Sequence, residues 1–360
     1  MDNKSGPSRR EFMEGVLASG AVFAFAGLAR GAQNGNSPGE PVLPLATERI
    51  PQPDNDMCGW LAFSPVNDRM ACASGILGEV SLYVSRAGQP EIFDVLWKPN
   101  AESSGIQTCA WSPDGKEIAF IAVYGNKETS PKFSKISICV VDVASGQVRE
   151  PVVISEFVDG EKRRSANVSY GKSLSWWPNS CVLVPANDGS VTKFDTHTGQ
   201  SETLIAAPDG MAIHNLTLTL SGELRFVKTR YLGPDQGGEF VLAGRSQDGA
   251  LNDYVNLTQQ LGQIFGARLS RNGDFIFAEK RDMSAIGYTP TTHLIYKIET
   301  RSVIAQIPQS VDYKDDTYIY IPMTMLNDKD LVLIEMIMMA VDGDSPMRRT
   351  TMKAVKMTLS

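Results

Sequence analysis

The 360-residue sequence predicts an all-β protein, a six-bladed β-propeller of four-stranded antiparallel blades that is closed by an N-terminal strand. Three observations lead to this prediction. A β-hairpin pattern recurs six times, a second hairpin follows it in most copies, and the last copy lacks one strand. Because 42% of the residues are hydrophobic, the chain can also bury a sizeable core.

The N-terminal segment has the composition of an export signal. Residues 8–14 are S-R-R-E-F-M-E, and the apolar run of residues 15–29 follows, built mainly from Ala, Gly, Val and Phe. The run is too short to span a bilayer. A charged segment followed by a short apolar segment and small residues is typical of a secretory signal.

The paired arginines make this signal more specific. Arg9 and Arg10, followed by Phe12, resemble the twin-arginine export signal, whose pattern is S-R-R-x-F-L-K, although Glu14 stands where Lys is usual. The resemblance implies a periplasmic or extracellular protein. We divide the chain into a signal peptide at 1–31, a linker at 32–40 and the β-propeller at 41–360.

The first hairpin of each repeat joins an apolar stretch, a polar turn with Pro, Asn, Asp or Gly, and a second apolar stretch. The clearest copy is CAWSPDGKEIAFIAV at residues 109–123. One position in the first apolar stretch aligns the six copies, at Phe63, Trp111, Trp176, Leu218, Leu269 and Met325. A repeat of about fifty residues is typical of a propeller, because one such unit cannot bury both of its faces alone.

The second hairpin turns at a Gly-Gln pair in three of the repeats, at residues 88–89, 146–147 and 199–200. Glycine permits the positive φ that such a turn needs. Each repeat is therefore predicted to contain four antiparallel strands, which we name A to D in chain order. A pair of β-sandwiches is the alternative, and six equivalent hairpins favour the propeller.

The second repeat carries the most specific pattern. W-S-P-D-G-K-E-I-A-F at residues 111–120, followed by V-D-V-A-S-G at residues 141–146, resembles the TolB-type, Trp-Asp-repeat-like propeller family. The resemblance extends over roughly residues 57–358, with weaker matches in the fourth and sixth repeats. It implies the propeller fold and is compatible with a binding or scaffold role, although fold alone does not define function.

The sixth repeat contains only three predicted strands, at about 318–325, 331–339 and 350–358. The stretch VLPLATERI at residues 42–50 is the natural donor of the fourth strand. A strand from one end of the chain that completes the blade at the other end would close the ring without a covalent bond.

The long connections between strands mostly share one face. Because antiparallel strands alternate, the B–C connections and the connections from D to the next A lie on the same side. The long ones are residues 125–134, 155–172, 229–238, 281–292, 309–318 and 341–349. Long loops on a rigid scaffold often carry function, and Arg and Tyr are common interface anchors. The predicted binding residues are Arg163, Arg164, Tyr170, Arg230, Tyr231, Arg281, Tyr288, Tyr313, Asp315 and Asp316.

Common catalytic and cofactor motifs are missing from the sequence. It contains no G-x-S-x-G, no P-loop, no G-x-G-x-x-G and no C-x-x-C. Its three histidines, His197, His214 and His293, are too scattered for a metal site built from several imidazoles. A net charge of −7 without a basic block argues against a nucleic-acid partner, and no apolar run is long enough for a transmembrane segment.

Two further groups of residues leave alternatives at the level of sequence. The five cysteines lie mostly in apolar stretches, which favours buried thiols, whereas an oxidising compartment would permit one disulfide, Cys58–Cys109. Carboxylates cluster in residues 312–316 and 341–346, where calcium would find oxygen ligands, although solvated acidic loops are the default explanation. We predict no metal and no cofactor.

The sequence thus predicts an exported binding or scaffold module that recognises a protein or a glycan through its long-loop face. The alternative is a propeller enzyme, a lyase, hydrolase or lactonase, with a metal or carboxylates in the central channel. The shortage of histidines and of clustered ligands favours the binding module, and no residue is predicted to be catalytic.

Overall fold

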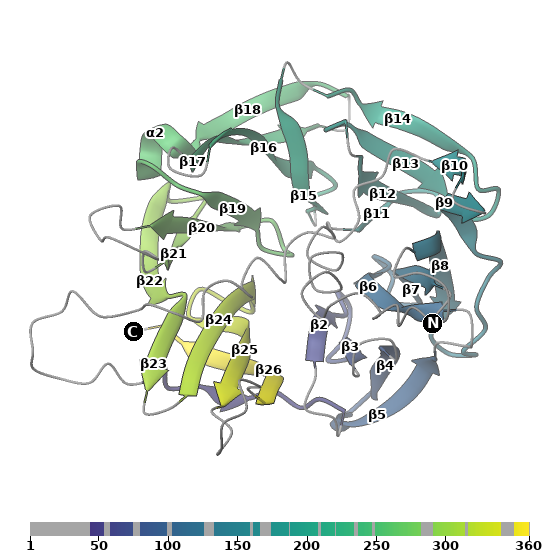
Figure 1. Cartoon of the computed structure of the whole chain (residues 1–360), viewed down its shortest axis with the longest axis horizontal. Helices are drawn as coiled ribbons and strands as arrows, with labels where there is room; N and C mark the ends of the chain where they lie inside the picture. Colours follow the sequence, from purple (N-terminus) through teal and green to yellow (C-terminus); the bar gives the residue numbers. More distant parts are fainter. Residues whose placement is uncertain are drawn as a thin grey trace, which may run out of the picture.

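The computed structural model describes residues 44–53, 58–74, 80–98, 103–125, 133–158, 161–165, 174–186, 188–207, 210–219, 221–233, 237–246, 249–281, 291–313, 316–339 and 349–359. These residues form six antiparallel sheets of four or five strands. Figure 1 shows the sheets as blades around a ring, in sequence order. The predicted six-bladed propeller is confirmed.

The blades consist of consecutive strands. Blade 1 contains β2 (Cys58–Phe63), β3 (Met70–Ser74), β4 (Ser81–Arg86) and β5 (Gln89–Trp97), and blade 2 contains β6 (Ser103–Trp111), β7 (Glu117–Gly125), β8 (Phe133–Asp142), β9 (Val152–Val158) and β10 (Glu161–Ser165). Blade 3 contains β11 (Ser175–Trp177), β12 (Cys181–Pro185), β13 (Val191–Asp195) and β14 (Ser201–Ile205), and blade 4 contains β15 (Ala212–Leu218), β16 (Leu224–Gly233), β17 (Gly237–Arg245) and β18 (Leu251–Asn256). After the short helix α2 (Leu257–Leu261), blade 5 contains β19 (Gly266–Leu269), β20 (Phe275–Arg281), β21 (Thr291–Lys297) and β22 (Ser302–Pro308). Blade 6 contains β23 (Ser310–Tyr313), β24 (Asp316–Met325), β25 (Asp330–Met339), β26 (Arg349–Thr358) and the N-terminal β1 (Glu48–Arg49).

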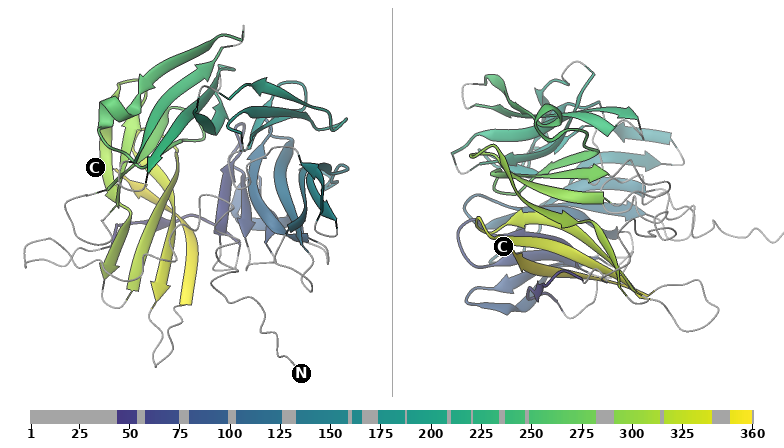
Figure 2. Two further views of the ribbon diagram at one scale, coloured as in Figure 1. Left: turned by 45° about the horizontal axis from the view of Figure 1, so that its top comes forward. Right: turned by 90° about the vertical axis from the view of Figure 1, so that its left-hand side faces the viewer.

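Neighbouring blades pack face to face, and each of the six interfaces has its own apolar cluster. Between blades 2 and 3, for example, Ile121 packs with Trp176 and Val182. Because a blade has a neighbour on each face, a middle strand such as β3 is buried along its whole length. The ring is closed, since Leu61 of blade 1 shares a cluster with Ile334 of blade 6. Figure 2 shows these two blades, purple and yellow, side by side.

Two tryptophans of the first strands hold neighbouring blades together. The indole N–H of Trp111 donates to the carbonyl of Ala62 in blade 1 at 3.0 Å. The indole N–H of Trp176 donates to the carbonyl of Ala110 in blade 2 at 2.9 Å. Each indole thus buries its ring at an interface while its polar N–H is satisfied, which explains why a large aromatic suits this repeat position.

The second hairpins turn where the sequence predicts. Gly88, Gly146 and Gly199 have φ values of 70°, 70° and 69°, which confirms the left-handed conformation expected of the Gly-Gln turns. In blade 5, Arg301 adopts φ 52° in the corresponding turn. A side chain in this region is strained, so the looser match of the fifth repeat has a local cost that the other turns avoid.

The N-terminal strand closes the ring as predicted. β1 pairs antiparallel with β26, and in Figure 1 the purple N-terminal segment reaches the yellow C-terminal blade. The backbone N–H of Ile50 donates to the carbonyl of Ala354 at 3.0 Å, and the N–H of Ala354 donates to Oε1 of Gln52 at 2.8 Å. The regular strand is shorter than the predicted stretch of residues 42–50 and covers two residues.

Three of the predicted long loops are largely strands, and this part of the prediction is wrong. Loop 155–172 contains the end of β9 and all of β10. Loop 229–238 contains the end of β16 and the start of β17, and loop 309–318 contains β23 and the start of β24. Their polar composition suggests loops, but backbone groups form the ladder of a hairpin, and an exposed strand tolerates polar side chains. For the other three predicted loops, 125–134, 281–292 and 341–349, residues 126–132, 282–290 and 341–348 lie outside the described residues.

The described cysteines are small buried residues. Cys72, Cys109, Cys139 and Cys181 are buried thiols, as the apolar pattern around them predicts. Burial raises the pKa of Cys139 to about 11. Because Cys109 is a thiol, the alternative Cys58–Cys109 disulfide is not formed.

Candidate functional site

The sequence-predicted binding residues are spread around the ring. Those in described strands are Arg163 and Arg164 in β10, Arg230 and Tyr231 in β16, Arg281 at the end of β20, Tyr313 in β23 and Asp316 in β24. Tyr170, Tyr288 and Asp315 lie outside the described residues, as do Arg9, Arg10 and Phe12 of the predicted signal. The described candidates therefore belong to four blades and do not form one cluster. Side chains are described for three of them, Arg230, Tyr231 and Asp316.

The β16–β17 hairpin of blade 4 is the best-defined part of the predicted face. Its ladder runs from the pair Leu224–Arg245 out to the pair Gly233–Gly237. The hairpin is therefore a rigid extension of the blade, whereas its sequence, TRYLGPDQGG, predicts a loop. Only residues 234–236 at its tip lie outside the description.

Glycines allow the tip of this hairpin to lie against the segment that leads into blade 5. A Cβ on Gly237, which has φ +72°, would lie 2.3 Å from the carbonyl oxygen of Ile264. The backbone N–H of Gly238 donates to the same carbonyl at 3.1 Å. Because Ile264 is itself buried and follows α2, the hairpin is braced from the side as well as by its own ladder.

The braced hairpin carries apolar surface into solvent. Tyr231 is 65% exposed and the following Leu232 is 51% exposed. On the ladder just before them, Nη1 of Arg230 lies 3.5 Å from Oε2 of Glu239, its register partner on β17. The hairpin therefore combines an exposed aromatic side chain, an exposed aliphatic side chain and a charge pair on one backbone ladder.

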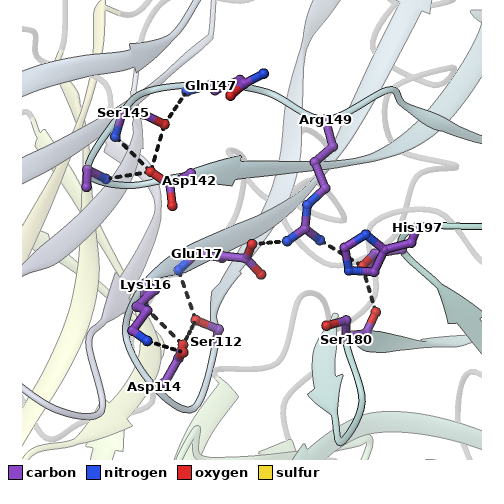
Figure 3. Close-up of polar contacts among 12 residues, drawn as sticks. Ser112, Asp114, Lys116, Glu117, Asp142, Ser145, Gln147, Arg149, Ser180 and His197 are labelled. Carbon is purple, nitrogen blue, oxygen red and sulfur yellow. Dashed lines mark hydrogen bonds and ion pairs between the residues drawn. The ribbon is translucent and has the colours of Figure 1, made fainter.

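On the opposite face, the A–B and C–D turns of blades 2 and 3 form a polar network, which Figure 3 shows. Glu117 forms an ion pair with Nη2 of Arg149, and Nη1 of Arg149 donates to the hydroxyl of Thr196 at 3.0 Å. The Thr196 hydroxyl in turn donates to the carbonyl of Ser180 at 2.6 Å. This chain of contacts joins blade 2 to blade 3.

The carboxylates of these turns are engaged by their own turns. Asp142 accepts hydrogen bonds from the backbone N–H groups of Ser145 at 2.7 Å and Ala144 at 3.1 Å, and these bonds, with that of Ser145 first, hold the pKa of Asp142 below its usual range. Asp114 accepts from the Ser112 hydroxyl, which lowers the pKa of Asp114 in the same way. These groups cap turns, so their chemistry is structural.

His293 is buried in the core and contacts the neighbouring blade, so its role is structural as well. His293 is 5% exposed, and its Nε2 lies 3.1 Å from the carbonyl oxygen of Tyr320 in the next blade. Burial, with the nearby charge of Arg268, lowers the pKa of His293 to about 3, so the imidazole is neutral at physiological pH. His197 lies in a C–D turn as predicted, and the side chain of His214 lies outside the description. Within the described ranges, no three His, Cys, Asp or Glu residues are grouped so that they could hold a metal ion.

Two arginines of blade 5 were not among the predicted site residues. Arg268 lies in β19 and Arg271 in the turn that follows it. The aligned repeats contain a signal for Arg271, because the same turn position is Pro65 in blade 1 and Pro113 in blade 2. Blade 3 has Pro178 there, so a long cationic side chain in blade 5 departs from the residue that three of the repeats share.

Comparisons by sequence find no relative. No family model matches the chain, and no curated protein matches it. Along the described part of the chain, no helix is both long and apolar enough to cross a membrane.

Several solved structures are similar to this chain. TolB from Acinetobacter baumannii is 17% identical, with a TM-score of 0.43 over 78% of this chain and 60% of that one. An oligogalacturonate lyase from Vibrio parahaemolyticus is 11% identical, with a TM-score of 0.49 over 82% of this chain and 76% of that one. A puromycin-hydrolyzing peptidase from Mycobacterium tuberculosis is 14% identical, with a TM-score of 0.45 over 77% of this chain and 41% of that one. The chain thus spans less than two thirds of TolB and of the peptidase, and at these identities the likeness concerns the fold alone.

Proposed function

We propose that the protein is a binding module that recognises a protein partner through the face carrying its B–C connections. The observation that supports this proposal is the exposure of Tyr231 and Leu232 on the braced β16–β17 hairpin. An ordered hairpin loses little conformational entropy on binding, so contacts made by its side chains contribute to affinity with a small ordering cost. A protein is favoured over a glycan because Leu232 offers an aliphatic surface, whereas sugars stack mainly on aromatic rings.

Site-specific photo-crosslinking tests this proposal. A photoreactive phenylalanine analogue is placed at position 231 of the full chain, expressed in cells that produce the protein naturally. The expected result is one discrete adduct with a second protein, identified by mass spectrometry. The same analogue at position 326 is the matched control, because Leu326 is 47% exposed but lies in an A–B turn on the opposite face.

Two companion variants make the outcome specific. Leu232→Asp should abolish the adduct from position 231, because it places a charge in the proposed contact, while Leu326→Asp should leave it unchanged. An adduct that forms equally from positions 231 and 326, or one that survives Leu232→Asp, contradicts recognition through this hairpin. A glycan array provides the alternative outcome. Binding to a glycan that is lost when Tyr231 is replaced, but is unchanged by Leu232→Asp, would assign the hairpin to a glycan instead.

We also propose export through the twin-arginine route, on the basis of Arg9, Arg10 and Phe12 in the sequence. The test is fractionation of cells that express the full chain or its Arg9→Lys/Arg10→Lys variant. The wild-type protein should be found outside the cytoplasm, and the variant, which keeps the charge but loses the guanidinium pair, should remain inside. Equal export of both proteins would overturn this route.

A further inference from the structure

Arg271 crosses the middle of the ring. It lies in the A–B turn of blade 5, yet its guanidinium carbon is 5.4 Å from the centre of the Trp60 ring in β2 of blade 1. These two blades are not neighbours, because blade 6 lies between them in the ring (Figure 1). The side chain therefore projects into the central channel and reaches its other wall.

Both ends of this contact are fixed by hydrogen bonds. The carbonyl of Arg271 accepts from the hydroxyl of Thr217 in blade 4 at 2.6 Å. The indole N–H of Trp60 donates to the carbonyl of Cys109 in blade 2 at 3.2 Å. Four blades thus position one guanidinium and one indole ring at the channel.

The charge of Arg271 lacks a carboxylate counterpart among the described residues. It forms none of the ion pairs found there, and the titratable group near it is the buried thiol of Cys109. Burial lowers the pKa of Arg271, although the side chain keeps an intermediate exposure. A guanidinium that is partly withdrawn from water is solvated less than one in bulk solvent, so its charge is incompletely compensated.

Other arginines of the propeller are compensated differently. Arg268, in the strand that leads into this turn, has the carboxylate of Glu279 near enough to favour its charged form. Arg69 also lies over a tryptophan ring, but its Nε donates to the carbonyl of Ser85 at 2.9 Å. Arg271 differs from both, because its contact with the face of the Trp60 ring stabilises the cation only in part.

We propose that the central channel binds a small soluble oxyanion, a carboxylate or a phosphate, at the guanidinium of Arg271 above Trp60. The N–H groups of a guanidinium lie in its own plane, where two of them match the two oxygens of such an anion, and contact with the face of an aromatic ring uses none of them as a hydrogen-bond donor. The net charge of the chain is −7, so the molecule as a whole repels an anion. A cation enclosed by channel walls would instead attract the anion locally.

Indole NMR signals provide a direct test. The chain contains five tryptophans, so a ¹⁵N-labelled sample gives five indole N–H signals, and Trp60→Phe assigns the one of interest. The full chain is titrated separately with inorganic phosphate and with succinate at constant ionic strength. We expect the Trp60 signal to shift with saturation for at least one of the two anions, and the anion that saturates at lower concentration identifies the ligand class.

Matched variants distinguish a site from general salt effects. Arg271→Gln should abolish the saturable shift, and Arg271→Lys, which keeps the charge but loses the planar fork, should weaken it about tenfold or more. Arg245→Gln is the control, because Arg245 lies 5.9 Å from the centre of the Trp177 ring, a similar stack on blades 4 and 3. It should leave the Trp60 titration unchanged.

The remaining outcomes each decide for or against the proposal. Linear, non-saturating shifts with both anions overturn it, and so does a saturable Trp60 shift that persists in Arg271→Gln. If Arg271→Gln fails to fold, as judged by its NMR spectrum, the wild-type titration and the Arg271→Lys variant still decide: saturation of the Trp60 signal that weakens in the Lys variant supports the site, and an unchanged Lys variant contradicts it.

Discussion

The two faces of the propeller use their side chains differently. On the turn face of blades 2 and 3, Asp142 caps its own turn, and Arg149 is held between Glu117 and Thr196. On the opposite face, the β16–β17 hairpin presents Tyr231 and Leu232 to solvent. The difference separates a face whose polar groups contact one another within the ring from a face that presents apolar side chains to solvent, and the second face is the one we propose for recognition. Substitutions on the first face should therefore change stability, and substitutions on the second should change binding.

The largest effect is expected at Gly115 on the turn face. Gly115 has φ +69°, and a Cβ there would lie 2.3 Å from Cγ2 of Val66 in blade 1. Gly115→Ala should lower the free energy of unfolding by about 2–4 kcal/mol, because left-handed strain and overpacking add. Urea denaturation followed by circular dichroism measures it.

Gly146 is the matched control for that substitution. It has nearly the same φ, +70°, but nothing lies within 4 Å of the added Cβ. Gly146→Ala should therefore cost only the conformational strain, about 1–2 kcal/mol. Equal losses at Gly115 and Gly146 would show that contact between the turns of blades 1 and 2 contributes nothing.

The next effect concerns the ion pair between Glu117 in β7 and Arg149 in the β8–β9 connection. The side chains of Arg149 and Glu117 are 28% and 20% exposed. Arg149→Met should lower the free energy of unfolding by about 1–2 kcal/mol, because it leaves a partly buried carboxylate and breaks the link to blade 3. A double-mutant cycle with Glu117→Gln isolates the pair itself.

A solvent-exposed pair provides the reference for this cycle. Arg86 and Asp94 form a bidentate contact, with side chains that are 52% and 50% exposed. Arg86→Met should change stability by less than about 0.5 kcal/mol. If the two pairs have the same coupling energy, the turn face is no more stabilising than ordinary surface.

A smaller effect is the pH dependence that the turn caps confer. The folded-state pKa of Asp142 and of Asp195 is lowered, in both cases first by backbone hydrogen bonds. Their contribution is therefore present above the unfolded-state pKa of about 4 and is lost as the pH falls through the folded-state value. Unfolding measured between neutral and acid pH should show a weaker acid destabilisation in Asp142→Asn/Asp195→Asn than in the wild type. An identical pH profile contradicts the capping role.

The smallest effect on stability is expected at the exposed hairpin. Leu232→Ser removes a side chain that is 51% exposed, so it should change the free energy of unfolding by less than about 0.5 kcal/mol. The same variant should weaken the adduct from position 231 at least tenfold. A loss of stability above about 1 kcal/mol would mean that Leu232 packs within the propeller, and the contrast between the two faces would fail.

The sequence predicts the repeated elements of this fold better than its departures from the repeat. The turns at Gly88, Gly146 and Gly199 are predictable because a positive φ requires glycine or a strained substitute. Trp111 and Trp176 are predictable because a repeated aromatic marks a repeated interface. Each of these features is encoded by a few adjacent residues.

Features that depend on contacts across the ring are not encoded locally. The hairpin that carries Arg230 and Tyr231 looks like a loop, because polar side chains and glycines conceal a backbone ladder whose bracing comes from Ile264. Arg271 looks like a solvated turn residue, because its partner Trp60 belongs to a distant blade. The spacing of blades around a channel, rather than any motif, creates that contact.

Closure of the ring by β1 imposes an order on folding. The hydrogen bond between Gln52 and Ala354 joins residues 302 positions apart, so blade 6 lacks its outer strand until nearly the whole chain has been synthesised. Once β26 has formed, and until β1 pairs with it, the edge of β26 offers unpaired backbone groups to any extended segment. The N-terminal segment of a second copy has the same sequence and competes for this edge. Folding at high protein concentration should therefore produce strand-exchanged dimers, and folding at high dilution should produce monomers.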